Sequence, residues 1–177
     1  MVKFLSLIIF LLFFMNSKMI FDFRKDLNIQ NWKVVDDTVM GGRSDGTFQL
    51  SDEGHGLFSG YVTTENNGGF SSVRCELGRI SVDGNKEVVI RLKGDGKNYQ
   101  FRVKASPSDY YSYIKEFSTS GEWEEIIIPL NEMYPSFRGR KLDFPNFSSE
   151  SISEITFLIG NKRKENFELL IDKIELQ

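Results

Sequence analysis

The chain has 177 residues, with 22 Lys and Arg against 25 Asp and Glu and a formal net charge of −3. This length suits one domain with a sizeable core, and 16 phenylalanines can fill that core without disulfides. The mildly acidic balance argues against nucleic-acid binding, which needs a basic face. Cys75 and His55 are the only residues of their types, so an intrachain disulfide is excluded and almost nothing remains for a zinc site or a Cys–His nucleophile pair. We expect Cys75 to be buried and His55 to lie in a loop.

The chain begins with an apolar run. Lys3 precedes residues 4–15, a run that is shorter than the roughly 20 residues of a membrane-spanning helix. We therefore expect residues 1–18 to be a secretory signal peptide, or an uncleaved anchor, since residues 16–18 offer no clear Ala-x-Ala cleavage site. A mitochondrial presequence would be amphipathic and Arg-rich, which this run is not. The expected location is periplasmic or extracellular.

Short runs of alternating apolar residues, separated by Gly, Asp and Asn clusters, predict β-strands in the first half of the remaining chain. Trp32 is the expected core anchor, and residues 51–54 form a turn between two strands in hairpin spacing. The predicted strands are residues 20–23, 47–51, 57–63 and 70–77.

The second half continues this pattern, with predicted strands at residues 87–93, 99–104, 112–117, 123–130, 155–159 and 167–174. Gly94-Asp95-Gly96 predicts a hairpin turn that pairs the first two of them. The clearest alternation places Tyr99, Phe101 and Val103 on one side and Gln100, Arg102 and Lys104 on the other. This pattern is typical of an antiparallel strand with one face in water.

No segment shows a sustained helical period, and about nine short strands at regular spacing predict an all-β sandwich. Residues 131–149 form a long irregular segment, and loops of this length are often functional. There is no internal repeat or boundary after the leader, so we expect one domain over residues 19–177.

Two segments have the same pattern: residues 36–44 and residues 65–74. In each, polar residues precede a Gly-Gly pair, and a serine and an arginine follow it. A Gly-Gly pair allows positive φ and close approach of another chain or ligand. Such pairs usually mark tight turns or bulges. Here both are flanked by Asp, Asn, Arg and Ser side chains that make directed hydrogen bonds, which makes the two loops a candidate binding site.

These motifs resemble the complex I intermediate-associated protein 30 (CIA30) family. Trp32 with residues 36–44 is similar to the family's opening motif, and residues 58–60, 66–74, 94–99 and 137–140 follow in its order and spacing. The resemblance runs from about Phe21 to Leu176. It implies a galactose-binding-domain-like jelly-roll β-sandwich, and a role as an assembly factor or chaperone that binds protein subunits of respiratory complex I, without a bound cofactor.

Seven residues of these motifs are candidate binding residues: Asp36, Asp37, Arg43, Asn66, Asn67, Arg74 and Arg138. Adjacent aspartates on an extended chain point to opposite faces, which weakens a paired-carboxylate mechanism. They either accept hydrogen bonds from loop amides or, with Arg43, hold a sugar or peptide ligand. The two loop arginines either pair with nearby carboxylates or dock a partner. The two asparagines either cap their turn or point outward as amide hooks.

The basic spot at residues 137–141, which contains Arg138, is either a solvated loop or a weak contact to an acidic membrane surface or partner. No metal site is predicted, although a structural calcium near Asp22 is conceivable in the implied fold.

Two functions follow. The first is a non-enzymatic module that binds protein subunits, for which we expect an exposed apolar patch. The alternative is an exported carbohydrate-binding module, for which Tyr110, Tyr111 and Tyr113 are the candidate aromatic platform. A hydrolase is disfavoured, because with one His and one Cys only the carboxylates remain as catalytic groups, and their spacing does not suit a paired mechanism.

Overall fold

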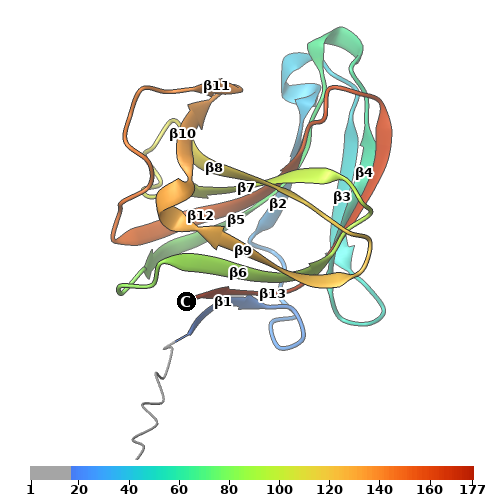
Figure 1. The fold of residues 1–177 in the computed structure, drawn as a ribbon. Coiled ribbons are helices and arrows are strands. Elements are labelled where there is room, and N and C mark those ends of the chain that lie inside the picture. Colours follow the sequence, from blue (N-terminus) through green and yellow to red (C-terminus); the bar gives the residue numbers. More distant parts are fainter. Residues whose placement is uncertain (1–16) are drawn as a thin grey trace, which may run out of the picture.

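A computed structural model describes residues 17–177 (Figure 1). The leader predicted at residues 1–18 therefore lies, except for its last two residues, outside the described part of the chain. Strand β1 already begins at Lys18. No helix among the described residues has both the length and the apolar character needed to cross a membrane.

The described residues form two antiparallel sheets packed face to face, which confirms the predicted all-β sandwich (Figure 1). Sheet 1 has the order β3 (Asp45–Leu50), β4 (Gly56–Val62), β13 (Glu165–Leu176), β6 (Glu87–Lys93) and β9 (Trp123–Pro129), with β1 (Lys18–Asp22) also paired to β13. Sheet 2 has the order β11 (Arg140–Lys141), β10 (Tyr134–Phe137), β8 (Ser112–Ser118), β7 (Asn98–Lys104), β12 (Ser151–Ile159), β5 (Ser71–Ser81) and β2 (Trp32–Asp36). Three short 3-10 turns connect strands: η1 (Asp37–Met40), η2 (Glu65–Asn67) and η3 (Leu130–Glu132).

The core lies between the two sheets, and Trp32 is one of its anchors, as predicted. Its ring lies 5.3 Å from Phe23, 5.0 Å from Phe48 and 6.4 Å from Phe157, measured between ring centroids. These contacts join β2 and β12 of sheet 2 to β3 of sheet 1 and to the segment after β1. Because aromatic side chains bury large apolar areas, this cluster helps to hold the two sheets together.

Strand β7 has the predicted alternation, with Tyr99, Phe101 and Val103 at most 1% exposed. The opposite face differs from the prediction, because Arg102 and its neighbours on that face are half-buried and not fully in water. Cys75 is buried as expected, and burial raises the pKa of its thiol to about 12, so it stays protonated at neutral pH.

The predicted hairpin between residues 87–93 and 99–104 is wrong. Strand β6 pairs with β13 and β9 in sheet 1, whereas β7 pairs with β8 and β12 in sheet 2. The connecting residues carry the chain from one sheet to the other, where the Asp95 carboxylate accepts hydrogen bonds from the Tyr99 hydroxyl at 2.9 Å and the Glu168 amide at 3.0 Å. Alternation shows which side chains face the core, but both sheets share one core, so it does not identify the neighbouring strand.

The segment 131–149 is also more regular than predicted, because it contains part of η3 and the strands β10 and β11. Both strands are short, and β10 carries a proline, so the strand pattern in the sequence is weak. They extend the edge of sheet 2 beyond β8 and leave residues 142–150 as an irregular return.

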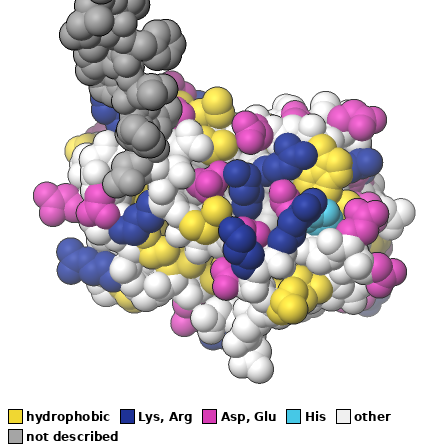
Figure 2. Space-filling model, turned by 90° about the horizontal axis from the view of Figure 1, so that it is seen from below, with side chains coloured by type: hydrophobic (Ala, Val, Ile, Leu, Met, Phe, Trp, Pro, Cys, Tyr) yellow, Lys and Arg dark blue, Asp and Glu magenta, His cyan; other side chains and the backbone are white. Residues whose placement is uncertain are grey.

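His55 lies in the turn between β3 and β4, as expected, but it is only 3% exposed. Its Nδ1 lies 3.2 Å from the Asp172 carboxylate, and its ring packs 4.6 Å from that of Trp123. Arg24 and Arg91 also pair with Asp172, so this half of the molecule carries a compact charged cluster. Figure 2 shows it on the lower face, where Lys and Arg side chains surround acidic ones next to the histidine.

Candidate functional site

The two Gly-Gly loops lie side by side, because both bind the carboxylate of Asp37. This side chain is fully buried. It accepts hydrogen bonds from the Ser44 amide and hydroxyl at 3.0 and 2.5 Å, and from the Gly69 and Phe70 amides at 2.6 and 3.2 Å. Burial alone would raise the pKa of the Asp37 carboxyl, but the hydrogen bonds from Ser44, Gly69 and Phe70 outweigh burial and lower it. Asp37 therefore joins the loops as an ionised acceptor.

In each Gly-Gly pair, one glycine adopts a positive φ and the other leaves space for the Asp37 carboxylate. Gly41 has φ +87° and Gly69 has φ +138°, conformations that side-chain-bearing residues rarely adopt. Gly42 and Gly68 supply room instead, since a Cβ on either would collide with the carboxylate of Asp37. The close approach expected at these glycines is thus made by a side chain of the same molecule.

The loop residues nearest to Asp37 have partners of their own. One Asp36 carboxylate oxygen accepts a hydrogen bond from the Gly46 amide at 3.1 Å, and the other is buried without a partner among the described residues. Arg43 is exposed and lies 3.4 Å from a Glu65 carboxylate oxygen. The Lys164 ammonium forms an ion pair with the same carboxylate at 2.6 Å, and its hydrogen bond and charge lower the pKa of Glu65.

Of the remaining predicted residues, Asn66 and Arg138 are exposed. Asn66 has φ +54° in η2, a turn conformation that asparagine tolerates. The side chain of Asn67 lies outside the described part of the structure. Arg138 has φ +49° in the β10–β11 turn, and its guanidinium lies 5.3 Å from the centroid of the Phe137 ring.

We predict that Arg43→Ala leaves the melting temperature of the protein unchanged, because an exposed ion pair adds little to stability. Differential scanning calorimetry of the variant and the wild type measures this. If the two loops form the docking site, partner capture by this variant is lost at unchanged stability. A clear drop in melting temperature would instead assign Arg43 a structural role.

The outer face of sheet 2 adjoins these loops. A row of directly opposed residues crosses it from strand to strand: Lys33, Arg74, Thr156, Arg102, Ile114 and Tyr134. Arg74 thus lies on β5 within this row, whereas Arg43 lies in its loop beside Glu65. The two predicted arginines have different surroundings, although their loops are adjacent.

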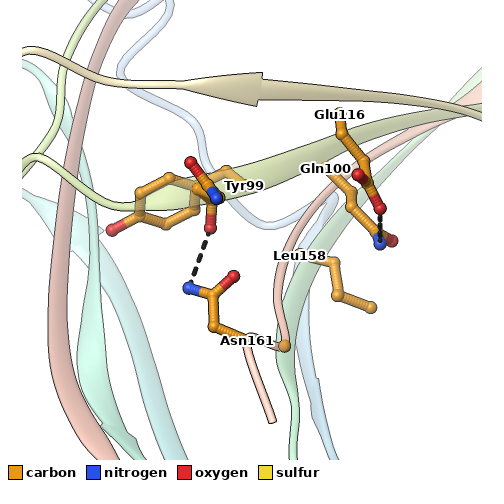
Figure 3. Close-up of a pocket in the computed structure, with 7 residues that line it drawn as sticks. Tyr99, Gln100, Glu116, Leu158 and Asn161 are labelled. Atoms are coloured by element: carbon orange, nitrogen blue, oxygen red, sulfur yellow. Dashed lines mark hydrogen bonds between the residues drawn. The ribbon is translucent and has the colours of Figure 1, made fainter. Parts of the chain in front are cut away.

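A small hollow opens on the same face, next to the row (Figure 3). Its volume is about 70 Å³, and its lining includes Asn98, Gln100, Glu116, Leu158 and Asn161. The Gln100 amide donates to Glu116 at 3.1 Å, and the Asn161 amide donates to the Asn98 carbonyl at 3.1 Å (Figure 3). Pockets for small molecules usually measure about 300–1,000 Å³, so this hollow can hold one side chain or a few waters.

An aromatic cluster lies where sheet 2 ends at β10 and β11. We call it the aromatic rim; its members are Tyr110, Tyr111, Tyr113, Phe137, Phe144 and Phe147, joined by ring contacts of 5.1–5.6 Å. Tyr110, Phe137 and Phe144 are 59%, 38% and 47% exposed. Burial raises the pKa of the Tyr113 hydroxyl to about 12, so this inner member stays neutral. The rim is therefore a connected patch with three exposed rings.

Cations lie in the β10–β11 turn beside Phe137 of this rim. Arg138 lies over the Phe137 ring, and the Lys141 ammonium lies 5.3 Å from the centroid of Tyr134. Arg140 is exposed in the same turn. Tyr, Phe and Arg are enriched at protein interfaces, and exposed connected apolar patches mark interaction sites.

The sequence pointed to this region only in part. The three tyrosines were predicted as an aromatic platform and residues 131–149 as a functional segment, but Phe137 and Phe144 were not named as site residues. The available signal was the four aromatic residues of the long irregular segment, Phe137 and Phe144 among them. Within residues 17–177, no group of three or more His, Cys, Asp or Glu side chains could hold a metal ion.

Three comparisons place the chain among known proteins. Residues 21–171 match the family model described as complex I intermediate-associated protein 30 (CIA30). The chain is similar to the proteins named "Complex I intermediate-associated protein 30, mitochondrial" from Drosophila melanogaster, at 25% identity, and from Mus musculus, at 23% identity. These matches cover 72% and 89% of this chain but 50% and 55% of the relatives. The chain thus spans about half the length of the curated relatives it matches.

Among solved structures, the fold is similar to the family 11 carbohydrate-binding module from Clostridium thermocellum, solved in complex with a β-1,3-1,4-mixed-linked tetrasaccharide. The TM-score is 0.67 over 90% of this chain and 94% of the module, at 17% sequence identity. This likeness shows the shared jelly-roll fold, as the resemblance implied.

Proposed function

The chain belongs to the complex I intermediate-associated protein 30 family, and on this premise we propose that it is a non-enzymatic domain that binds protein subunits of a membrane complex during assembly. The leader predicted at residues 1–18 would deliver the domain to the periplasmic or extracellular side. The observation that carries the proposal is the aromatic rim.

The rim suits a protein partner for three reasons. Its exposed rings are connected, so a partner can cover them together and exclude water. Its inner members are packed against one another, which reduces the entropy lost when a partner binds. Its border contains Arg138 and Arg140, and arginines beside aromatic anchors are typical of binding hot spots.

The test uses a tagged chain expressed in its own host. Gentle crosslinking, purification from soluble, periplasmic and membrane fractions, and mass spectrometry identify what is captured. We expect respiratory-complex subunits with the wild type. Replacing Tyr110, Phe137 and Phe144 together by alanine should reduce their recovery at least about tenfold, because truncating hot-spot aromatics removes most of the binding free energy.

The matched control is Tyr61→Ala, which removes a 41%-exposed ring from β4, a strand of the other sheet. This control should capture the same subunits as the wild type. Equal recovery with the rim variant, at a melting temperature equal to that of the wild type, would refute the rim as the docking surface.

The second candidate function is glycan binding, which the tyrosines of the rim support. Their geometry is less favourable for a sugar chain, because the Tyr110 ring meets Tyr111 at 73° and Phe137 at 83°, so the rings do not form one flat platform. Calorimetric titration with a β-1,3-1,4-mixed-linked tetrasaccharide tests this function. Saturable binding that Tyr110→Ala abolishes, with no protein captured, would replace the first proposal by this one.

A further inference from the structure

We propose that the outer face of sheet 2 holds a carboxylate-binding site made by Arg74 and Arg102, and that its ligand is an acidic segment of a partner polypeptide. The site lies on β5 and β7 and shares no residue with the aromatic rim. The polypeptide nature of its ligand rests on the proposed function.

The register of sheet 2 places the two guanidinium-bearing residues on one face. Arg74 on β5 and Arg102 on β7 are both paired with Thr156 on the strand between them. Neighbouring strands lie about 4.8 Å apart, so the two Cα atoms are separated by roughly 10 Å. Two long side chains at that spacing can converge on one carboxylate from either side of Thr156.

Neither arginine has an anionic partner within residues 17–177. The Nε of Arg74 is buried and has no hydrogen-bond partner there. Arg102 donates from Nε and from one terminal nitrogen to the amide oxygen of Gln100, at 3.0 and 2.5 Å. Buried charges are normally paired, and a buried donor without an acceptor is unfavourable. The face is therefore arranged to receive an acceptor from outside.

The neighbouring carboxylates are engaged elsewhere. Glu76 pairs with Lys33 at 3.1 Å, and Glu116 accepts from the Gln100 amide. The Thr156 hydroxyl lies 3.5 Å from a Glu154 oxygen. These groups border the arginine pair without forming an ion pair with it.

The two arginines also act on each other. Burial lowers the pKa of Arg102 to about 10, while Tyr134 opposes that shift and the charge of Arg74 adds to it. Arg102 therefore still carries a positive charge at neutral pH. Two cations in one partly buried place repel each other, and an anion between them relieves this repulsion.

The surroundings favour a monoanionic carboxylate on a polypeptide. Glu116 and Glu154 on the same face would repel the second charge of a phosphate group. The arginine fork matches a carboxylate in a bidentate geometry. The adjoining hollow is lined by Asn98 and Asn161, whose Nδ2 and Oδ1 respectively make no hydrogen bond among the described residues and can bind a peptide backbone.

An acidic sugar chain fits this face less well, because sugars stack on open aromatic ring faces. The aromatic residue in the arginine row is Tyr134, and the Lys141 ammonium lies over its ring. A sugar at this position would have to displace that cation.

The test measures fluorescence anisotropy of a labelled hexaglutamate peptide, with labelled hexaglutamine as the neutral counterpart. We expect saturable binding of hexaglutamate, weakened at least about tenfold by Arg74→Met and by Arg102→Met. Arg74→Lys should weaken it less, because it keeps the charge but loses the fork. Arg79→Met, at an exposed position of the same strand, should bind like the wild type.

The wild-type protein provides a readout that does not depend on folding of the variants. On titration with N-acetylglutamate, the Nε–H resonances of Arg74 and Arg102 should shift in NMR spectra while those of Arg79 and Arg138 stay in place. Equal binding of hexaglutamate and hexaglutamine, unshifted Arg74 and Arg102 resonances, or an equal loss with Arg79→Met would overturn the proposal. Competition by polygalacturonate at lower concentration than hexaglutamate would reassign the site to an acidic glycan.

The rim variant separates this inference from the proposed function. It should bind hexaglutamate like the wild type even though it loses the captured subunits. If the rim variant keeps its subunits while Arg102→Met still loses hexaglutamate, the rim proposal fails and the arginine site stands.

Discussion

Replacing Asp37 by alanine is expected to lower the free energy of unfolding by about 4 kcal/mol. The substitution removes the acceptor shared by the Ser44 amide and hydroxyl and by the amides of Gly69 and Phe70. Each buried donor left without an acceptor destabilises the protein by about 1–3 kcal/mol, and water entering the cavity offsets part of the sum. Urea unfolding followed by tryptophan fluorescence measures the loss.

Asp45→Ala is the matched control, because Asp45 is an exposed aspartate at the start of β3 whose carboxylate makes no hydrogen bond within the described residues. It should change the unfolding free energy by less than about 0.5 kcal/mol. Similar losses for Asp37→Ala and Asp45→Ala would contradict the structural role of Asp37.

The contribution of Asp37 also depends on pH in a defined direction. Because the folded-state pKa of its carboxyl lies below the ordinary value of 3.8, its stabilisation is fully present above that value and is lost as pH falls through the lowered pKa. The stability difference between the wild type and Asp37→Asn should therefore be constant above about pH 5 and shrink below about pH 4. A difference that stays constant down to pH 2 would argue against an ionised Asp37.

Gly42→Ala is expected to lower the free energy of unfolding by about 3 kcal/mol, and Gly41→Ala by only about 1 kcal/mol. A Cβ at Gly42 collides with the Asp37 carboxylate, which its four hydrogen bonds hold in place. A Cβ at Gly41 meets no atom within 4 Å, but the residue keeps an unfavourable φ of +87°. Thermal and urea unfolding of the two variants compare the two effects.

The adjacent positions serve as each other's control, since sequence context and residue type are nearly the same. Gly68→Ala should behave like Gly42→Ala, because it meets the other oxygen of Asp37. Should Gly41→Ala prove the more damaging change, backbone conformation and not room for the carboxylate would explain the Gly-Gly pairs.

These two predictions separate the hydrogen bonds around Asp37 from the sites proposed for binding. The Gly-Gly loops carry the segments that identify the family, yet their polar side chains mostly bind one another. The exposed rings of the rim and the side chains of Arg74 and Arg102 lie outside the Asp37 network. A motif can thus identify the family because the fold requires it.

The amino-acid sequence by itself determined the fold class. Alternation at Tyr99, Phe101 and Val103 identified side chains that face the core, and the absence of a helical period left only sheets. Trp32 and Cys75 were correctly predicted to be buried. These properties depend on the local spacing of apolar residues, which each strand carries in its own sequence.

Only the tertiary structure decided how distant segments meet. It placed β6 and β7 in different sheets, joined two loops through Asp37, and brought residues 110–113 next to residues 137–147 to form the rim. It also aligned Arg74 with Arg102 on either side of Thr156, although the two arginines are 28 positions apart in the sequence. Strand order and register depend on the packing of a core shared by both sheets, so local patterns do not contain them.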